Sequence, residues 1–175
     1  MKKLYIFLLF VGFQLFANSQ PFENAIQYND YIVGQQNLIG LKILAFNNEF
    51  GVENASREII QPYYDSLLST TREVVVRMQN LEDFDGNEQF LKASVDLMEF
   101  YLRTVEGAYL EMINIFFDPD FNDQSMEKLN TLLNNITTEE AIYDDSFQKS
   151  QEAFAIKYGF TLEKNALEEE LNSDN

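Results

Sequence analysis

Carboxylates gather in two short stretches of this sequence, where they could bind a hard cation. Glu49 and Glu53 lie in the first stretch, and Asp118, Asp120 and Asp123 lie in the second. Several carboxylate oxygens together are what calcium requires of a protein site. The Asp-x-Asp-x-Asn spacing of the second stretch lacks the EF-hand glycine and the final glutamate, so it does not predict an EF-hand. Because Asp and Asn are also ordinary turn and N-cap residues, solvated turns are the alternative to a calcium site.

A second candidate site consists of polar residues on otherwise apolar helical faces. Its members, projected at 100° per residue, are Asn29, Gln36, Thr71, Tyr101 and Glu140. Counting along each predicted helix places all except Gln36 at one level, about 16 to 18 residues from a shared end. Such a layer either fixes the register of a bundle or binds a small ligand or an ion. A buried carboxyl with no cation beside it has a raised pKa, which is also a mark of functional sites. The remaining alternative is that the helical projection is wrong.

Composition excludes several kinds of chemistry. The 175 residues include no Cys and no His, which removes thiol catalysis, Ser-His-Asp triads and His-ligated metals. With 12 Lys and Arg against 29 Asp and Glu, the formal net charge is −17, which argues against nucleic acid and anionic lipid as partners. We therefore expect no cofactor and no enzymatic activity.

Four long stretches must position these residues, and each has apolar residues at three- and four-residue spacing. They span about residues 22–47, 54–81, 87–117 and 123–158. Short connections between long helices predict an all-α, up-down-up-down four-helix bundle over residues 20–161, followed by an acidic tail over 162–175. Pro62 predicts a kink in the second helix or a start there, and a break is possible at Thr137-Thr138. Gly159 is placed to end the last helix.

The first nineteen residues have the features of a secretory signal peptide. Lys2 and Lys3 precede the apolar run 4–16, and Ala17-Asn18-Ser19 forms a small-x-small cleavage pattern. The apolar run is short for a membrane span, so a retained anchor is the less favoured alternative. We expect a soluble mature protein that is secreted or periplasmic, without stable membrane insertion.

The signal peptide ends in Ala-Asn-Ser-Gln with no lipobox cysteine, and the first helix begins with Tyr-Asn-Asp-Tyr-Ile-Val-Gly-Gln-Gln over residues 28–36. These stretches resemble uncharacterised secreted or surface helical-bundle proteins of Bacteroidota. The resemblance covers the first helix and the general layout, and it implies no activity. It makes Asn29 and Gln36 more interesting, because both lie in the matching stretch.

Together these features predict a non-catalytic module that binds a partner, with a basic protein as the partner that the charge favours. The alternative function is binding of a small ligand or calcium, through the polar layer or the loop carboxylates.

Cleavage of the signal peptide is directly testable. Mass spectrometry of the exported protein should find Gln20 at the N-terminus, in part cyclised to pyroglutamate. An intact N-terminus in the membrane fraction would contradict the export prediction.

Overall fold

The computed structural model describes residues 22–52 and 55–162. The predicted signal peptide, Glu53 and nearly all of the acidic tail therefore lie outside the described residues. The described elements are α1 (Ala25–Phe50), α2 (Arg57–Gln79), α3 (Glu88–Thr104), the π-helical turn η1 (Val105–Tyr109), α4 (Leu110–Phe116) and α5 (Asp123–Tyr158).

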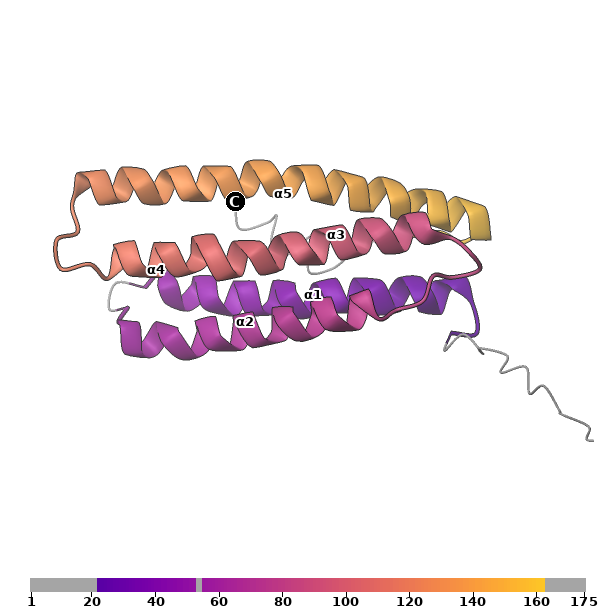
Figure 1. The fold of residues 1–175 in the computed structure, drawn as a ribbon, viewed down its shortest axis with the longest axis horizontal. Helices are drawn as coiled ribbons and strands as arrows, with labels where there is room; N and C mark the ends of the chain where they lie inside the picture. Colours follow the sequence, from indigo (N-terminus) through magenta and orange to yellow (C-terminus); the bar gives the residue numbers. More distant parts are fainter. Residues whose placement is uncertain (1–21, 53–54, 163–175) are drawn as a thin grey trace, which may run out of the picture.

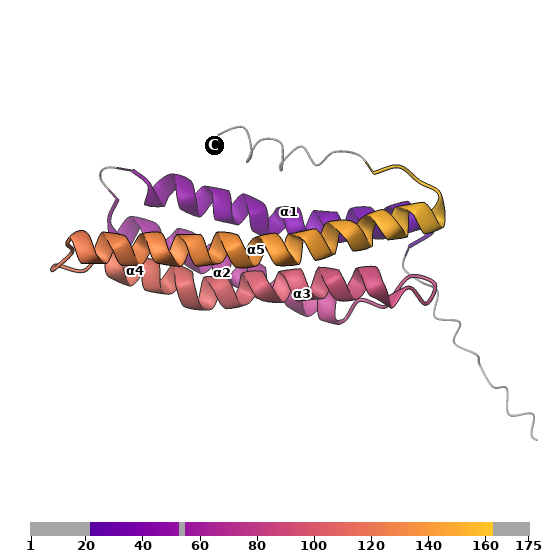
Figure 2. The same ribbon diagram turned by 90° about the horizontal axis from the view of Figure 1, so that it is seen from above.

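These elements form four long helical rods lying side by side, and α3, η1 and α4 together make the third rod (Figure 1). The α1–α2 and α4–α5 connections lie at one end of the bundle, and the α2–α3 connection lies at the other (Figures 1 and 2). Within the described ranges there is no strand, only an isolated bridge between Phe84 and Asn87. The prediction of an all-α helical bundle is thus confirmed at the level of fold class.

The helix ends follow local capping rules. The side chains of Asn24 and Ser56 accept hydrogen bonds from backbone N–H groups in the first turns of α1 and α2. Asn122 and Ser125 form a reciprocal capping box at the start of α5. Gly159 follows α5 with φ of 72°, a left-handed conformation that glycine adopts without steric cost. The predicted end of the last helix is therefore confirmed.

Two of the alternatives for helix boundaries, a start at Pro62 and a break at Thr137-Thr138, are excluded. α2 begins at Arg57, so Pro62 lies inside the helix and does not start it. α5 runs without a break through Thr137 and Thr138. The hydroxyls of these two threonines donate to the carbonyls four residues earlier, at 3.1 and 2.8 Å, so they are satisfied within the helix.

An aromatic cluster fastens α1, α3, α5 and the α2–α3 connection at one end of the bundle. The ring centroid of Tyr28 lies 5.7 Å from that of Phe154 and 5.5 Å from that of Phe84, and the rings of Phe90 and Phe154 are 5.0 Å apart. The Tyr28 hydroxyl donates to the carbonyl of Glu82 at 3.1 Å, which ties the connection to α1. Burial raises the pKa of this hydroxyl, so it stays a donor at physiological pH.

A second aromatic cluster lies at the opposite end. Phe50 lies 5.3 Å from Phe46 and 4.8 Å from Phe116 between ring centroids, which joins α1 to α4. The Arg57 guanidinium lies 5.7 Å from the Phe117 ring centroid and donates to the Asn114 side chain at 3.1 Å. Aromatic contacts therefore join helices at both ends of the bundle.

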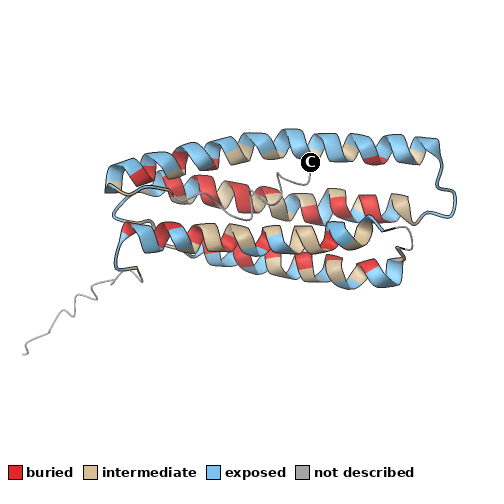
Figure 3. Ribbon diagram, turned by 180° about the vertical axis from the view of Figure 1, so that it is seen from behind, coloured by how far each residue is buried: buried red, intermediate tan, exposed pale blue. Residues whose placement is uncertain are grey.

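α5 is packed unevenly along its length. It packs on α3 extensively but on α1 only sparsely. Its buried residues are Leu129, Phe147, Ser150, Phe154 and Ala155, so four of the five lie in its C-terminal part. Leu133, which the sequence places on the apolar stripe, is 48% exposed. Figure 3 shows the predominance of exposed positions along this helix.

Phe154→Ala should remove an anchor of the first aromatic cluster. Phe154 is fully buried, so the change should lower the free energy of unfolding by about 3–5 kcal/mol. Ile156→Ala is the matched control on the same helix, because Ile156 is 81% exposed and the change should stay within about 0.5 kcal/mol. Urea unfolding followed by circular dichroism measures both, and equal losses would contradict the described packing of α5.

Candidate functional site

Three of the five predicted polar residues come together between three helices. Gln36 comes from α1, Tyr101 from α3 and Glu140 from α5. The Tyr101 side chain has hydrogen-bonding interactions with those of both Gln36 and Glu140. All three residues are half-buried. The polar cluster, as we name Gln36, Tyr101 and Glu140, therefore spans the bundle from α1 to α5.

The electrostatics of the polar cluster favour protonated acids. Burial is the main cause of the raised pKa of Glu140. The hydrogen bond from Tyr101 lowers this pKa in part, and the charge of Asp144 adds to the increase. Burial, followed by the charges of Glu140 and Asp144, raises the pKa of Tyr101. The pKa of Tyr109 is raised by burial and by Glu140. The Glu140 carboxylate thus lies among two tyrosines and a second acid.

Asn29 and Thr71 have other partners. The Asn29 carbonyl oxygen accepts from Gln151 Nε2 at 2.8 Å, and its amide donates to Asp30 at 3.1 Å. Asn29 precedes Gln36 by two helical turns, about 10 Å along α1. Thr71 is buried, and its hydroxyl donates to the carbonyl of Leu67 at 2.8 Å within the same helix. Asn29 therefore joins α1 to α5 and Thr71 is satisfied within α2, and neither belongs to the polar cluster.

Sequence reasoning missed a buried glutamine on the neighbouring face of α1. Gln35 is buried and accepts from Arg77 Nη1 at 3.0 Å, while Arg77 also pairs with Glu73 at 2.9 Å. This contact joins α1 to α2. The sequence signal for this contact was the adjacent pair Gln35-Gln36. Because neighbouring residues of a helix point in different directions, a second glutamine beside Gln36 has to find a partner on another helix.

The π-helical turn η1 lies directly beside the polar cluster. Its last residue is Tyr109, and the carbonyl of its first residue, Val105, accepts from the Tyr64 hydroxyl at 3.3 Å. Single π-turns inside α-helices are frequent at functional sites. The ring of Tyr109 lies 5.2 Å from that of Phe46 and is buried. Gly107, inside a helical pattern, was the sequence signal for this irregularity.

The nearest arginine on α3 has other acceptors. Arg103 pairs with Glu139 at 3.4 Å and donates to the Tyr143 hydroxyl at 3.0 Å. Glu99, one helical turn before Arg103, accepts from Gln79 at 2.7 Å. Among the residues that the structure describes, Glu140 takes part in no ion pair.

The loop carboxylates have structural roles in the described part of the chain. Asp118 accepts from the backbone N–H of Asp120 at 2.8 Å, and Asp123 lies in the first turn of α5. Glu49 is half-buried near the end of α1, and Glu53 lies outside the described residues. Across residues 22–52 and 55–162, no group of three or more acidic side chains is arranged to hold a metal ion.

No family model matches the chain, and neither a curated protein nor a solved structure matches it. Over its described length, the chain contains no helix with the length and apolar character needed to cross a bilayer. The polar cluster and the surface charge are therefore the features of the described chain that bear on function.

Glu140→Gln keeps the shape of the side chain and removes its ionisation. Because the folded pKa of Glu140 lies above its unfolded value, the native carboxyl favours folding at low pH and loses that contribution as pH rises through the folded pKa. The variant should therefore melt at a higher temperature than the parent at pH 7.5, with a smaller gain at pH 5. Glu127→Gln, at an exposed position of α5, is the control for net charge. Identical shifts in the two variants would contradict a half-buried Glu140.

Proposed function

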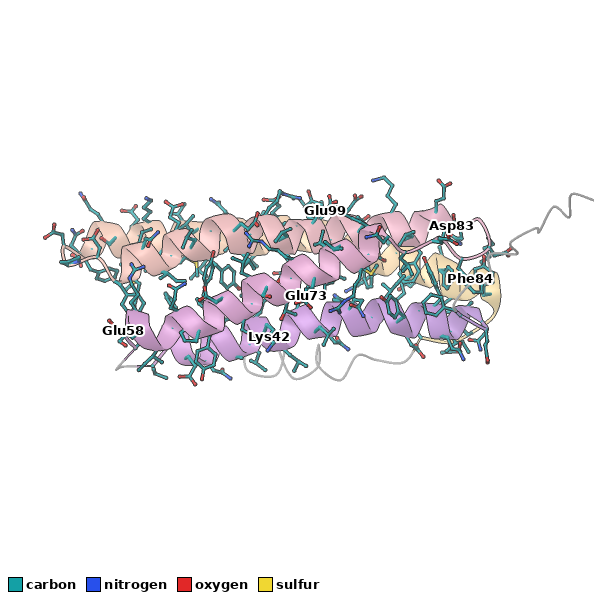
Figure 4. The ribbon with its side chains drawn as sticks, turned by 60° about the horizontal axis from the view of Figure 1, so that its bottom comes forward. Lys42, Glu58, Glu73, Asp83, Phe84 and Glu99 are labelled. Carbon is teal, nitrogen blue, oxygen red and sulfur yellow. The ribbon has the colours of Figure 1, made fainter. Side chains whose placement is uncertain are left out.

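We propose that the mature chain is an exported, non-catalytic binding protein, folded as an up-down-up-down bundle, that recognises a basic protein partner. The observation that carries this proposal is the excess of surface carboxylates over the bases that could neutralise them. The chain holds 29 acidic residues against 12 basic ones. Figure 4 shows acidic residues spread over the length of the bundle, from Glu58 through Glu73 and Glu99 to Asp83.

The ion pairs of the structure leave this excess in place. The described residues form six salt bridges, each using one base and one carboxylate. These pairs lie at the surface, where each contributes little to stability. The basic side chains in these pairs already have acidic partners, while the excess negative charge of the surface remains. Such a field attracts a basic partner over a distance and raises the association rate more than the affinity.

A second candidate function is binding of a small organic cation at the polar cluster. The specific observation in its favour is Glu140, a half-buried carboxylate beside Tyr101 and Tyr109. A carboxylate next to aromatic rings is chemically suited to an ammonium group. For this candidate, Glu140→Gln should abolish binding of the amine, whereas a surface-wide interaction would survive the change.

A pull-down of the mature protein from envelope extract tests the proposed function. Proteins retained at low salt and released at high salt should be basic, and each should bind again when purified, with an affinity that falls as salt rises. The same proteins should be retained whether calcium or EDTA is added to the extract, because the proposed interaction needs no metal ion. Retention that is independent of salt, or retention of acidic proteins only, would contradict the proposal.

A further inference from the structure

A heptad-spaced row of α5 residues is buried in the C-terminal half of the helix and half-exposed in its N-terminal half. Met126, Leu133, Glu140, Phe147 and Phe154 follow one another at seven-residue intervals, and because each interval falls about 20° short of two full turns, the row drifts around the helix. Phe147 and Phe154 are buried against the core. Met126 and Leu133, which are 46% and 48% exposed, lie at the edge of the core-facing side that Leu129 and Ile136 continue. An apolar stripe of this kind is typical of a helix that packs against a neighbour.

α1 helps to cover the buried half of this row, whereas Met126 and Leu133 remain about half exposed. Contacts between α1 and α5 include the hydrogen bond from Gln151 to Asn29 and the ring contact between Phe154 and Tyr28. Both lie at the end of the bundle where α1 begins. Over their whole described length, the two helices pack only sparsely on each other. The open half therefore presents two apolar side chains followed, one heptad later, by a half-buried carboxylate.

We propose that this docking face, made of Met126, Leu133 and Glu140, binds a basic amphipathic helix of the partner protein. The proposal rests on the proposed function and names the surface and the chemistry of the partner. Two apolar residues of the partner, seven positions apart, would cover Met126 and Leu133, and a Lys or Arg one heptad further would meet Glu140. The three positions span about 21 Å along α5, so a partner helix needs about fifteen residues to reach all of them.

Charge complementarity selects this occupant over two others. A second copy of the chain would bring a net charge of −17 and another Glu140 to the face. The segment 163–175 contains five acidic residues and one lysine, so it is also mismatched in charge. A basic helix instead supplies the cation that Glu140 lacks among the described residues, and it shields the exposed apolar stripe from water.

Thiol labelling of the full mature chain tests the docking face, because the sequence contains no cysteine to interfere. L133C places a single thiol on the face, and I142C places one at a position of α5 that is 66% exposed. The probe is a synthetic helix of about fifteen residues, with leucines at its first and eighth positions and lysines elsewhere. We expect it to slow maleimide labelling of L133C at least tenfold and that of I142C less than twofold. A matched peptide with serine in place of each leucine should protect neither thiol.

Calorimetry with the same peptide tests the role of Glu140. E140Q should weaken the affinity at least fivefold, while E127Q, which makes the same charge change at an exposed position of α5, should alter it less than twofold. Equal effects of the two variants would overturn the role of Glu140.

The remaining outcomes separate the docking face from the proposed function. Binding of the leucine–lysine peptide with equal protection of both thiols would overturn the docking face and leave a general acidic attraction. Slow labelling of L133C in the absence of peptide would also overturn the docking face. If the labelling rate depended on protein concentration, a second copy would be the occupant. If the rate did not depend on concentration, the occupant would be the chain's own tail. If no basic peptide binds at all, the proposed function itself fails.

Discussion

The constraint on which this structure depends is that α5 is clamped to α1 at one end only. The aromatic contacts of Tyr28 with Phe84 and Phe154 gather three elements around a fully buried ring. Dense packing of this kind fixes side chains in single arrangements. The other neighbours of α5 are α3 and α4, and α3 packs on it most extensively. The open stripe, the half-buried Glu140 and the position of the polar cluster all follow from this asymmetry.

The architecture could be predicted because its signals are local. Helical periodicity, short connections and the capping residues Asn122 and Gly159 each act within a few positions of the chain. What could not be predicted is how completely each face is covered. Leu133 and Phe154 belong to one stripe in the sequence, yet one is half-exposed and the other fully buried. That difference depends on where α1 diverges from α5, which no local pattern encodes.

The polar cluster also combines features that could be predicted from local sequence with features that could not. The projection of Gln36, Tyr101 and Glu140 inward was informative because helical geometry alone determines which face a residue occupies. Their common level was harder to predict, since it depends on true helix starts and on the π-turn Val105–Tyr109. Asn29 shows the consequence, because its partner is Gln151 rather than a member of the cluster. Gln35 was missed because its partner Arg77 comes from a different helix.

The central claim is that α5 has one clamped half and one half open for a basic partner. Amide hydrogen exchange of the mature protein, alone and with the leucine–lysine peptide, tests it most directly, because local protection reports local stability. Residues 126–140 should exchange faster than residues 147–158 in the free protein, and they should become the most strongly slowed segment when the peptide is added. Uniform protection along α5 in the free protein, or slowing by the peptide confined to other helices, would contradict the claim.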